Sequence, residues 1–427
     1  MSERPAQLVA IEKPVYGGSF LARVEGKAVF VPLALPGEQV RIHITQDKRG
    51  YANAEIDEVV ETAPQRIAPA CPHFGVCGGC SYQHAGYETQ LAWKQAILRE
   101  TMERAGVPVP QETAVLSGEP WRYRNRIRLA VDARGKAGYR GRRSHSIVPV
   151  EECPIAAPLL VRAALRLQEE LLRCKPLPPV KEMTLFCNST ETALLASVQT
   201  AGPAKRVGED LFRALAQAIP ELQGMELAVN GRDGQPPRRI AHWGETAISY
   251  RASEVDYRVD QGAFFQINRW LVDPLVEAVT AEASGLLAWD LFAGVGLFAR
   301  QLARGFDRVV AVESAAASTE ALRSNLRETC SHTICVDTLG FLRRNANGER
   351  PDLIVVDPPR TGLGDEVTTQ LERIAAPSLV YVSCDPATLA RDLKSLLAGG
   401  YEIHTMTLID LFPQTFHLEA VVHLRRA

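Results

Sequence analysis

A single cysteine, Cys384, follows an apolar segment near the end of the chain. The segment 378–383 reads Ser-Leu-Val-Tyr-Val-Ser, and Asp385 and Pro386 come directly after the cysteine. This order predicts a strand, then the thiol, then the start of a helix, at the edge where open α/β sheets bind their ligands. Because a helix dipole favours a nearby thiolate, Cys384 is the candidate nucleophile of an enzyme. A buried structural cysteine is the alternative.

Two carboxylates in the same half of the chain could handle protons. Glu419 lies in the apolar run 418–424, and a carboxylate that such a run partly desolvates has a raised pKa and can act as a base. An outward-facing strand residue is the alternative for Glu419. Asp357 ends another apolar segment, and the two prolines that follow it set its carboxylate at the ligand edge. A helix N-cap is the alternative for Asp357.

A glycine-containing turn is expected after the first strand of the same region. The segment 290–299 places Gly294 and Gly296 where the backbone can approach a ligand closely. Glu313 ends the next expected strand, where a carboxylate can hold two ribose hydroxyls. The pattern fits NAD or S-adenosylmethionine (SAM), and a tight turn without a ligand is the remaining alternative.

Three cysteines cluster in the first third of the chain. Cys71, Cys77 and Cys80 flank two glycines, and Cys153, which precedes a proline, is the best candidate for a fourth ligand. A Cys-Pro pair recurs at iron-sulfur sites, so a cluster is favoured. Zinc is the second candidate, although the paired spacing of a zinc ribbon is missing.

Positive charge gathers between residues 121 and 145, which hold nine Lys or Arg and one acid, Asp132. Four arginines alternate with mostly apolar residues, which predicts a strand with all four guanidinium groups on one face. These arginines are Arg122, Arg124, Arg126 and Arg128. Arginine is well suited to binding phosphate, so a nucleic-acid surface is expected, and a solvated edge strand is the alternative.

The elements that must position these residues indicate an α/β multidomain protein. Residues 8–60 read as short strands and turns of a small barrel, and 61–70 as a linker. Helices are expected at 87–105 and 158–173, with proline-rich breaks at 174–180 and 231–238. From residue 285, strands and helices alternate, which predicts a parallel sheet covered on both faces, with a closing antiparallel edge. The expected strands are 286–292, 308–313, 333–337, 353–357, 379–383, 402–409 and 417–424.

The length of 427 residues calls for more than one domain, and we expect boundaries that give 1–62, 63–262 and 263–427. Hydrophobic residues make up 46% and charged residues 23%, with a net charge of −2. No apolar run approaches membrane-spanning length, and residues 1–5 lack the pattern of a signal peptide. A cytoplasmic protein without a membrane partner is therefore expected. In a reducing compartment, nine cysteines indicate metal binding or catalysis before disulfides.

Taken together, these motifs resemble the RNA uracil-C5 methyltransferases that carry an iron-sulfur cluster. Residues 8–60 look like the TRAM domain of that family, an OB-like RNA-binding barrel. Further similarities lie in Phe264-Phe265-Gln266-Ile267-Asn268, in 381–386 with the nucleophile signature, and in His417-x-Glu419. The sequence departs from the family at Asp385, which is usually asparagine, and at Leu297, where many members have a polar residue.

The resemblance implies an N-terminal TRAM barrel, a central α+β iron-sulfur domain and a C-terminal Rossmann-like class I methyltransferase domain. It implies that Cys384 adds to uracil C6, and that Glu419 removes the C5 proton. SAM contacts are expected from Gln266, Phe292, Gly294, Gly296, Glu313, Asp337 and Asp357. A [4Fe-4S] cluster would be held by Cys71, Cys77, Cys80 and Cys153.

The expected function is SAM-dependent formation of 5-methyluridine in RNA by a monomeric enzyme. The expected target is 23S ribosomal RNA, and transfer RNA is the alternative. Two more distant alternatives are an NAD-dependent oxidoreductase with an accessory cluster and a non-catalytic RNA-binding protein. The oxidoreductase leaves Cys384 and Glu419 without a purpose, and the binding protein leaves a complete set of catalytic residues unused.

Overall fold

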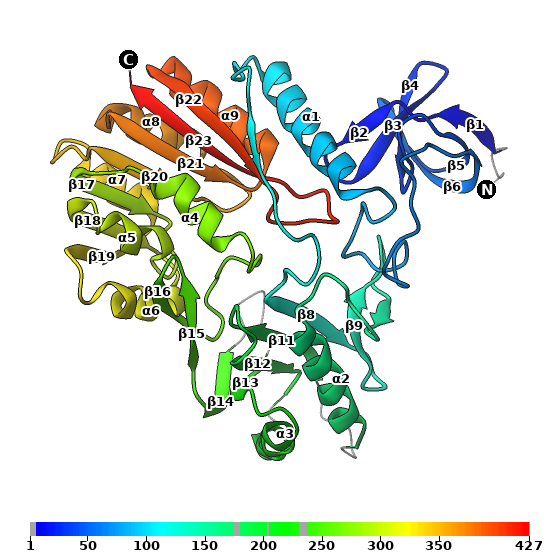
Figure 1. Cartoon of the computed structure of the whole chain (residues 1–427), viewed down its shortest axis with the longest axis horizontal. Coiled ribbons are helices and arrows are strands. Elements are labelled where there is room, and N and C mark those ends of the chain that lie inside the picture. Colours follow the sequence, from blue (N-terminus) through cyan, green and yellow to red (C-terminus); the bar gives the residue numbers. More distant parts are fainter. Residues whose placement is uncertain (1–5, 174–179, 203–204, 230–237, 427) are drawn as a thin grey trace.

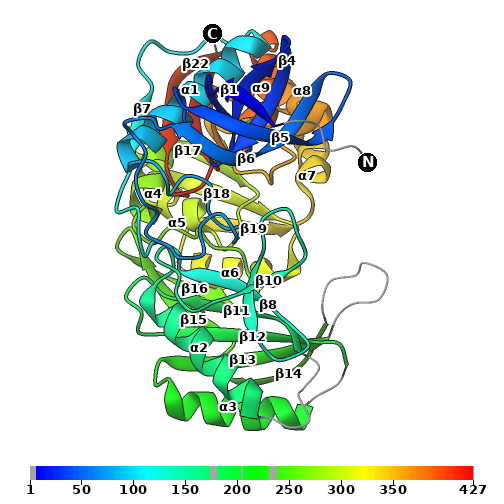
Figure 2. The same ribbon diagram turned by 90° about the vertical axis from the view of Figure 1, so that its right-hand side faces the viewer.

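The computed structural model describes residues 6–173, 180–202, 205–229 and 238–426 of the chain. Three parts meet at the centre of the molecule: an N-terminal sheet, a central sheet with helices and a C-terminal α/β part (Figure 1). The part that is central in the sequence lies at one end of the molecule in space, also in the view turned by 90° (Figure 2). The proline-rich breaks expected at 174–180 and 231–238 lie outside the described residues, apart from the last residue of each.

The N-terminal part is a six-stranded sheet, as the sequence predicted. Its strands are β1 (Gln7–Ala10), β2 (Lys13–Val15), β3 (Ser19–Val24), β4 (Lys27–Pro32), β5 (Gln39–Asp47) and β6 (Tyr51–Glu61). They lie in the order β1-β5-β6-β4-β3-β2. Alternate residues are buried in β4 (Val29, Val31) and in β5 (Val40, Ile42), and Trp93, from outside the sheet, packs in the same core. This period of two is what a half-buried strand requires.

The central part is a seven-stranded sheet with two helices. The strands are β8 (Arg126–Val131), β9 (Ala137–Arg140), β10 (Ile147–Pro149), β11 (Val180–Cys187), β12 (Leu194–Thr200), β13 (Leu222–Val229) and β14 (Arg238–Gly244), in the order β10-β9-β8-β11-β12-β13-β14. The helices are α2 (Pro158–Arg173), with the expected bounds, and α3 (Lys205–Ala218). Leucines of α2 pack against the strands, so the apolar stripe of this helix closes the core.

The C-terminal part is the predicted parallel sheet with an antiparallel edge. Its strands are β17 (Gly285–Leu291), β18 (Phe306–Glu313), β19 (Ser331–Cys335), β20 (Leu353–Val356), β21 (Ser378–Ser383), β22 (Tyr401–Ile409) and β23 (Glu419–Arg426). A further strand from earlier in the chain, β7 (Ala114–Leu116), completes the sheet, whose order is β19-β18-β17-β20-β21-β23-β22-β7. Its helices are α4 (Val272–Thr280), α5 (Leu297–Leu302), α6 (Ala316–Leu326), α7 (Thr338–Asn345), α8 (Gly364–Ile374) and α9 (Pro386–Ala398). Within the described ranges, no helix is both long and apolar enough to cross a bilayer.

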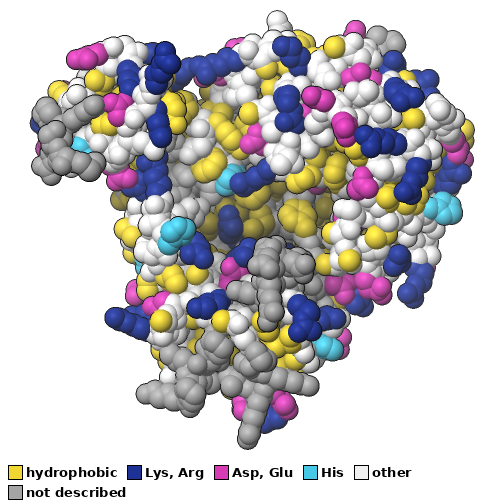
Figure 3. Space-filling model, turned by 180° about the vertical axis from the view of Figure 1, so that it is seen from behind, with side chains coloured by type: hydrophobic (Ala, Val, Ile, Leu, Met, Phe, Trp, Pro, Cys, Tyr) yellow, Lys and Arg dark blue, Asp and Glu magenta, His cyan; other side chains and the backbone are white. Residues whose placement is uncertain are grey.

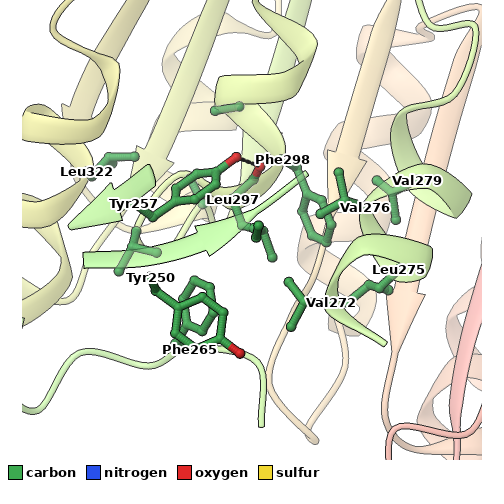
Figure 4. Close-up of a cluster of buried hydrophobic side chains, with 14 of the residues drawn as sticks. Tyr250, Tyr257, Phe265, Val272, Leu275, Val276, Val279, Leu297, Phe298 and Leu322 are labelled. Atoms are coloured by element: carbon green, nitrogen blue, oxygen red, sulfur yellow. Dashed lines mark hydrogen bonds between the residues drawn. The ribbon is translucent and has the colours of Figure 1, made fainter. Parts of the chain in front are cut away.

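Packing does not follow the order of the chain. Helix α1 (Tyr87–Ala105) places Ile97, Leu98 and Met102 in one core of the C-terminal sheet, and β7 (Ala114–Leu116) extends that sheet beside β22. The hairpin of β15 (Ala247–Ala252) and β16 (Val255–Asp260) belongs to the other core, around α4 and α5 (Figure 4). There the Tyr257 hydroxyl donates to the Leu297 carbonyl at 3.1 Å. The domain boundary at 262/263 stays a prediction. Segments before this boundary share hydrophobic cores with the residues after it.

The loop between β22 and β23 reaches the centre of the molecule, where the three parts meet (Figure 1). It is fixed to α1 by a buried ion pair: Lys94 Nζ lies 2.5 Å from Asp410 Oδ1, and both side chains are 0% exposed. Burial lowers the pKa of Lys94, and the charge of Asp410 opposes that shift. A buried charge is tolerated only with its partner in place.

Replacing Lys94 by methionine should therefore destabilise the protein strongly, because Asp410 would keep a buried charge without its cation. We expect the free energy of unfolding to fall by about 3–5 kcal/mol. Urea denaturation followed by circular dichroism measures it. The double variant Lys94→Met/Asp410→Leu should lose less, since it buries no lone charge. Equal losses in the single and double variants would contradict this view of the pair.

Candidate active site

Cys384, Glu419 and Asp357 come together at one edge of the C-terminal sheet. Cys384 follows the last residue of β21, Asp357 follows β20, and Glu419 is the first residue of the antiparallel strand β23. These three strands are neighbours, with Ser383 paired to Ala420 and Val356 paired to Tyr381. The register therefore brings a thiol and two carboxylates close together. Seen from behind, the molecule is hollowed between its parts, with hydrophobic side chains inside the hollow and Lys and Arg around it (Figure 3).

The thiol of Cys384 is half-buried, and its pKa is raised to about 12 by burial and then by the charges of Glu419 and Asp357. The expected stabilisation of the thiolate by the helix dipole is thus wrong for this structure. Burial and the two carboxylates outweigh any effect of the helix dipole. Asp385 is the N-cap of α9, and its carboxylate accepts the N–H groups of Ala387 and Thr388, each at 3.0 Å. Asparagine caps helices equally well, so the departure at Asp385 preserves this contact.

Both carboxylates have a pKa above the ordinary value of a carboxyl group. Burial raises the pKa of Asp357 to about 7. Burial, followed by the charge of Asp357, raises the pKa of Glu419 well above its ordinary value, and Arg360 opposes that shift. Glu419 is only 5% exposed, which agrees with the desolvation expected from its apolar run. Asp357 is not a helix N-cap, because the next helix, α8, begins at Gly364 and is preceded by Leu363.

The glycine turn lies at the same edge, after β17. Gly294 and Gly296 have φ values of 55° and 89°, which glycine adopts without strain, whereas Phe292 has a φ of 70°, which residues with a side chain rarely adopt. A Cβ at Gly296 would lie 2.9 Å from Leu322 Cδ1, so this residue also permits close helix packing. Glu313 accepts the N–H of Gly294 at 2.8 Å, which joins the ends of β17 and β18.

Three further expected cofactor residues have defined places. Gln266, in the segment before α4, is 8% exposed, and Asp337 caps α7 by accepting the Gly340 N–H at 2.8 Å. Leu297 is buried in the core with Phe298 and Leu322 (Figure 4). The departure at Leu297 therefore has a packing explanation.

The four arginines do not share one face, so that prediction is wrong. The strand begins only at Arg126, and Arg122 has a φ of 52°, which breaks the alternation. Arg126 donates to the Ala263 carbonyl at 2.8 Å and lies over the Phe186 ring. Arg124 and Arg128 both line a cavity, and Arg128 also pairs with Glu182 at 2.5 Å. Strand β8 pairs on both sides, with β9 and β11, so the alternative of an edge strand is wrong as well.

The four cysteines of the expected cluster line one cavity of about 170 Å³. Burial raises the pKa of Cys71, Cys77 and Cys80, the last to about 12, and the charge of Cys153 adds to each shift. In the described part of the chain, no three His, Cys, Asp or Glu side chains are placed to hold one metal ion.

Two contacts at this site have no sequence signal. The Tyr16 hydroxyl, from the N-terminal sheet, lies 3.5 Å from the Cys384 carbonyl oxygen, across a separation of 368 residues. Arg360 Nη2 lies 3.3 Å from His417 Nδ1, and burial together with this cation lowers the pKa of His417 to about 4. Neither pair can be found from spacing, because each depends on how distant segments pack.

Comparisons with known proteins agree with this site. Residues 349–427 match the family described as tRNA (Uracil-5-)-methyltransferase, and residues 3–56 match the TRAM domain. A 23S rRNA (uracil(1939)-C(5))-methyltransferase RlmD from Aeromonas salmonicida is 33% identical, covering 94% of this chain and 92% of its own. An uncharacterized RNA methyltransferase from Thermotoga maritima is 32% identical, covering 97% and 98%.

A solved structure has the same overall fold. The tRNA (uracil-54, C5)-methyltransferase of Pyrococcus abyssi, in complex with S-adenosyl-L-homocysteine, superposes with a TM-score of 0.78 at 24% identity. The superposition covers 98% of this chain and 100% of that one. The fold and the site thus define a SAM-dependent RNA methyltransferase with an N-terminal TRAM domain. The chain belongs to the RNA (uracil-C5)-methyltransferases, which excludes the NAD-dependent oxidoreductase that the glycine turn had left open.

Asp290, in β17 below the glycine turn, should make stability depend on pH. Its side chain is fully buried, and its pKa is raised to about 7 by burial and by Asp357 and Glu313, although Oδ2 accepts the Ala299 N–H. In the unfolded chain the pKa is about 3.9. Between these values the folded state holds a proton that the unfolded state has lost, so stability falls as pH rises.

Asp290→Asn should remove this component. The unfolding free energy of the wild type minus that of the variant should fall between about pH 4 and pH 8, because only the wild type has a carboxyl group at position 290 that ionises in that window. Urea denaturation at several pH values measures the difference. Curves for the two proteins that run parallel would show that Asp290 does not titrate as the structure indicates.

Proposed function

We propose that this enzyme methylates C5 of one uridine in 23S ribosomal RNA, and that Cys384 is the nucleophile and Glu419 the base. The observation that carries the proposal is the convergence of that thiol with the buried carboxylate of Glu419 and the partly buried carboxylate of Asp357, beyond the glycine turn. RlmD relatives, named for 23S ribosomal RNA, support the target. Transfer RNA is the second candidate, because the Pyrococcus protein with the same fold is named for it. We expect a monomer that works in the cytoplasm, where its RNA is found.

The chemistry begins at the uracil ring. The Cys384 sulfur bonds to C6, its proton passes to a neighbouring carboxylate, and the added electron pair makes C5 nucleophilic. SAM supplies the methyl group to C5 when it is bound. Glu419 then takes the C5 proton, and the returning electron pair expels the Cys384 thiolate. The raised pKa of Glu419 makes it a stronger base than an exposed carboxylate.

Several groups would hold the two substrates. We assign the SAM contacts to Phe292, Gly294, Gly296, Glu313 and Asp337 around the turn, with Gln266 and Asp357 facing uracil or SAM. The target base must leave its stack unless it already lies in a loop. Arg122 and Arg128 are exposed and remain proposed RNA contacts, together with the TRAM sheet. Arg124 and Arg126 are turned inward and support this surface instead.

We propose that Cys71, Cys77, Cys80 and Cys153 hold a [4Fe-4S] cluster with a structural role. The donor set supports it: four thiols line one cavity, and positive iron would offset the cost of their buried charges. A single zinc ion is the weaker alternative. The reaction is redox-neutral, so a structural role is the simpler one. Ser81 and Tyr82, directly after Cys80, donate their N–H groups to the Gln414 carbonyl in the loop before Glu419.

Two substitutions should separate the roles of the proposed catalytic residues. With SAM and a 23S RNA fragment that contains the target, Cys384→Ser should lose all methylation and form no covalent complex, because the sulfur is absent. Glu419→Gln should accumulate a protein–RNA adduct, because C5 keeps its proton and the sulfur cannot leave. Denaturing gels and 5-methyluridine mapping measure both outcomes.

RNA with 5-fluorouridine at the target is the positive control, since its fluorine blocks the last step and traps the wild-type adduct. Methylation by Cys384→Ser, or no trapped complex on an RNA proven to be the substrate, would contradict the mechanism. The same assay on transfer RNA decides the target: methylation of transfer RNA alone would overturn the ribosomal assignment.

Removal of iron should weaken both RNA binding and turnover, because it would loosen the segment around Cys80. The residues directly after Cys80 are hydrogen-bonded to the loop before Glu419. Mild oxidation of the iron-loaded protein, followed by iron analysis, RNA titration and turnover, tests this. Unchanged RNA affinity and turnover after iron loss would show that the cluster supports neither. A metal content of one zinc and no iron would overturn the cluster itself.

A further inference from the structure

The loop between β22 and β23 is held by donors from distant parts of the chain. Four consecutive carbonyl groups, from Leu411 to Gln414, each accept a hydrogen bond from outside the loop. The donors are Asn268 Nδ2 to Leu411 at 3.2 Å, Lys94 Nζ to Phe412 at 2.9 Å, Tyr123 Oη to Pro413 at 3.0 Å, and the N–H groups of Ser81 and Tyr82 to Gln414 at 2.9 and 3.0 Å. An unbroken series of this kind fixes the backbone path of the loop.

Gln414 has an unusual backbone conformation within this series. Its φ is 68°, in the left-handed region that residues with a side chain rarely adopt, and its side chain is 2% exposed. Such a conformation persists only where surrounding contacts impose it. Besides the Ser81 and Tyr82 N–H groups, the Gln90 amide of α1 contacts Gln414 here, and its Nε2 also donates to the Tyr82 and Ala85 carbonyls. Gln90 Oε1 accepts the Gln414 N–H at 3.0 Å, and Gln90 Nε2 donates to Gln414 Oε1 at 2.9 Å.

The segment after Gln414 leads directly to the reacting groups. The Phe416 ring lies edge-on to Tyr16, with centroids 5.7 Å apart, and His417 contacts Arg360. Glu419 follows, paired with Ile409 to close the hairpin. If the backbone at Gln414 relaxed to a negative φ, the path of residues 415–418 would change. The Glu419 carboxylate would then lose its place beside Cys384.

We propose that Gln90 and Gln414 are positioning residues for the proton-removal step, and that their paired amides hold the loop that leads to Glu419. This inference rests on the proposed function. It separates two stages of one reaction. Addition of Cys384 needs the end of β21 and a carboxylate that takes the thiol proton, a role that Asp357 after β20 can fill, whereas release of the product needs Glu419 in place.

The test is Gln90→Leu, which keeps the volume of the side chain but removes its amide. Turnover on ordinary RNA should fall about 10- to 100-fold, the loss typical of a misplaced catalytic group. KM for RNA should change little, and a covalent adduct with ordinary RNA should accumulate. Trapping by 5-fluorouridine RNA should keep its wild-type rate, since trapping does not use the base.

Gln95→Leu is the matched control, because Gln95 lies on the same helix and donates to the Thr113 carbonyl, away from the loop. It should behave as the wild type does. Position 414 supplies a second test if Gln90→Leu folds poorly. Gln414→Ala should lose more turnover than Gln414→Gly, since glycine adopts a positive φ without strain and both variants keep the backbone hydrogen bonds.

The outcomes distinguish this inference from the function beneath it. Wild-type turnover in Gln90→Leu, or an equal loss of trapping and turnover, would overturn the positioning role. Equal turnover in the alanine and glycine variants at 414 would also count against it. No trapped complex with the wild-type protein on a proven substrate would overturn the proposed function, and the positioning role with it.

Discussion

The ion pair of Lys94 and Asp410 is the interaction on which the arrangement of the active site depends. Neither charge can remain in an apolar core alone, so α1 must return to the C-terminal sheet although the whole central part follows it in the chain. The Asp410 N–H also donates to the Leu116 carbonyl of β7 at 2.9 Å. Asp410 thus connects the loop before Glu419 to helix α1 and to strand β7, which both come from the first third of the sequence.

The electrostatics of the site follow from burying several acids at one sheet edge. Asp290, Asp357 and Glu419 each have a raised pKa, and the charges of the last two help to raise that of Cys384 to about 12. Such a thiol is almost entirely protonated at neutral pH. Addition to a pyrimidine must therefore be accompanied by proton transfer, and a carboxylate with a pKa near 7 is a well-matched acceptor. The raised pKa values of Cys384 and Asp357 thus favour proton transfer during addition over a thiolate that is already formed.

Local pattern predicted most elements, whereas long-range contacts could not be predicted. Helix α1 has the bounds expected from its sequence, because helix periodicity is a local property. The prediction that the four arginines share one face was wrong. Alternate residues lie on one face only if the backbone stays extended, and Arg122 does not have an extended conformation. The contact of Tyr16 with the Cys384 carbonyl has no local signal at all. The motifs located the proposed catalytic residues, but their protonation depends on burial that only the assembled fold creates.

Asp385 shows how a small substitution can keep a structural role while adding charge. As the N-cap of α9, its carboxylate accepts the N–H groups of Ala387 and Thr388, which an asparagine amide oxygen could accept equally well. The same carboxylate, with burial, raises the pKa of Tyr16, whose ring packs against Phe416. The TRAM sheet, the nucleophile segment and the loop before Glu419 therefore meet at Tyr16.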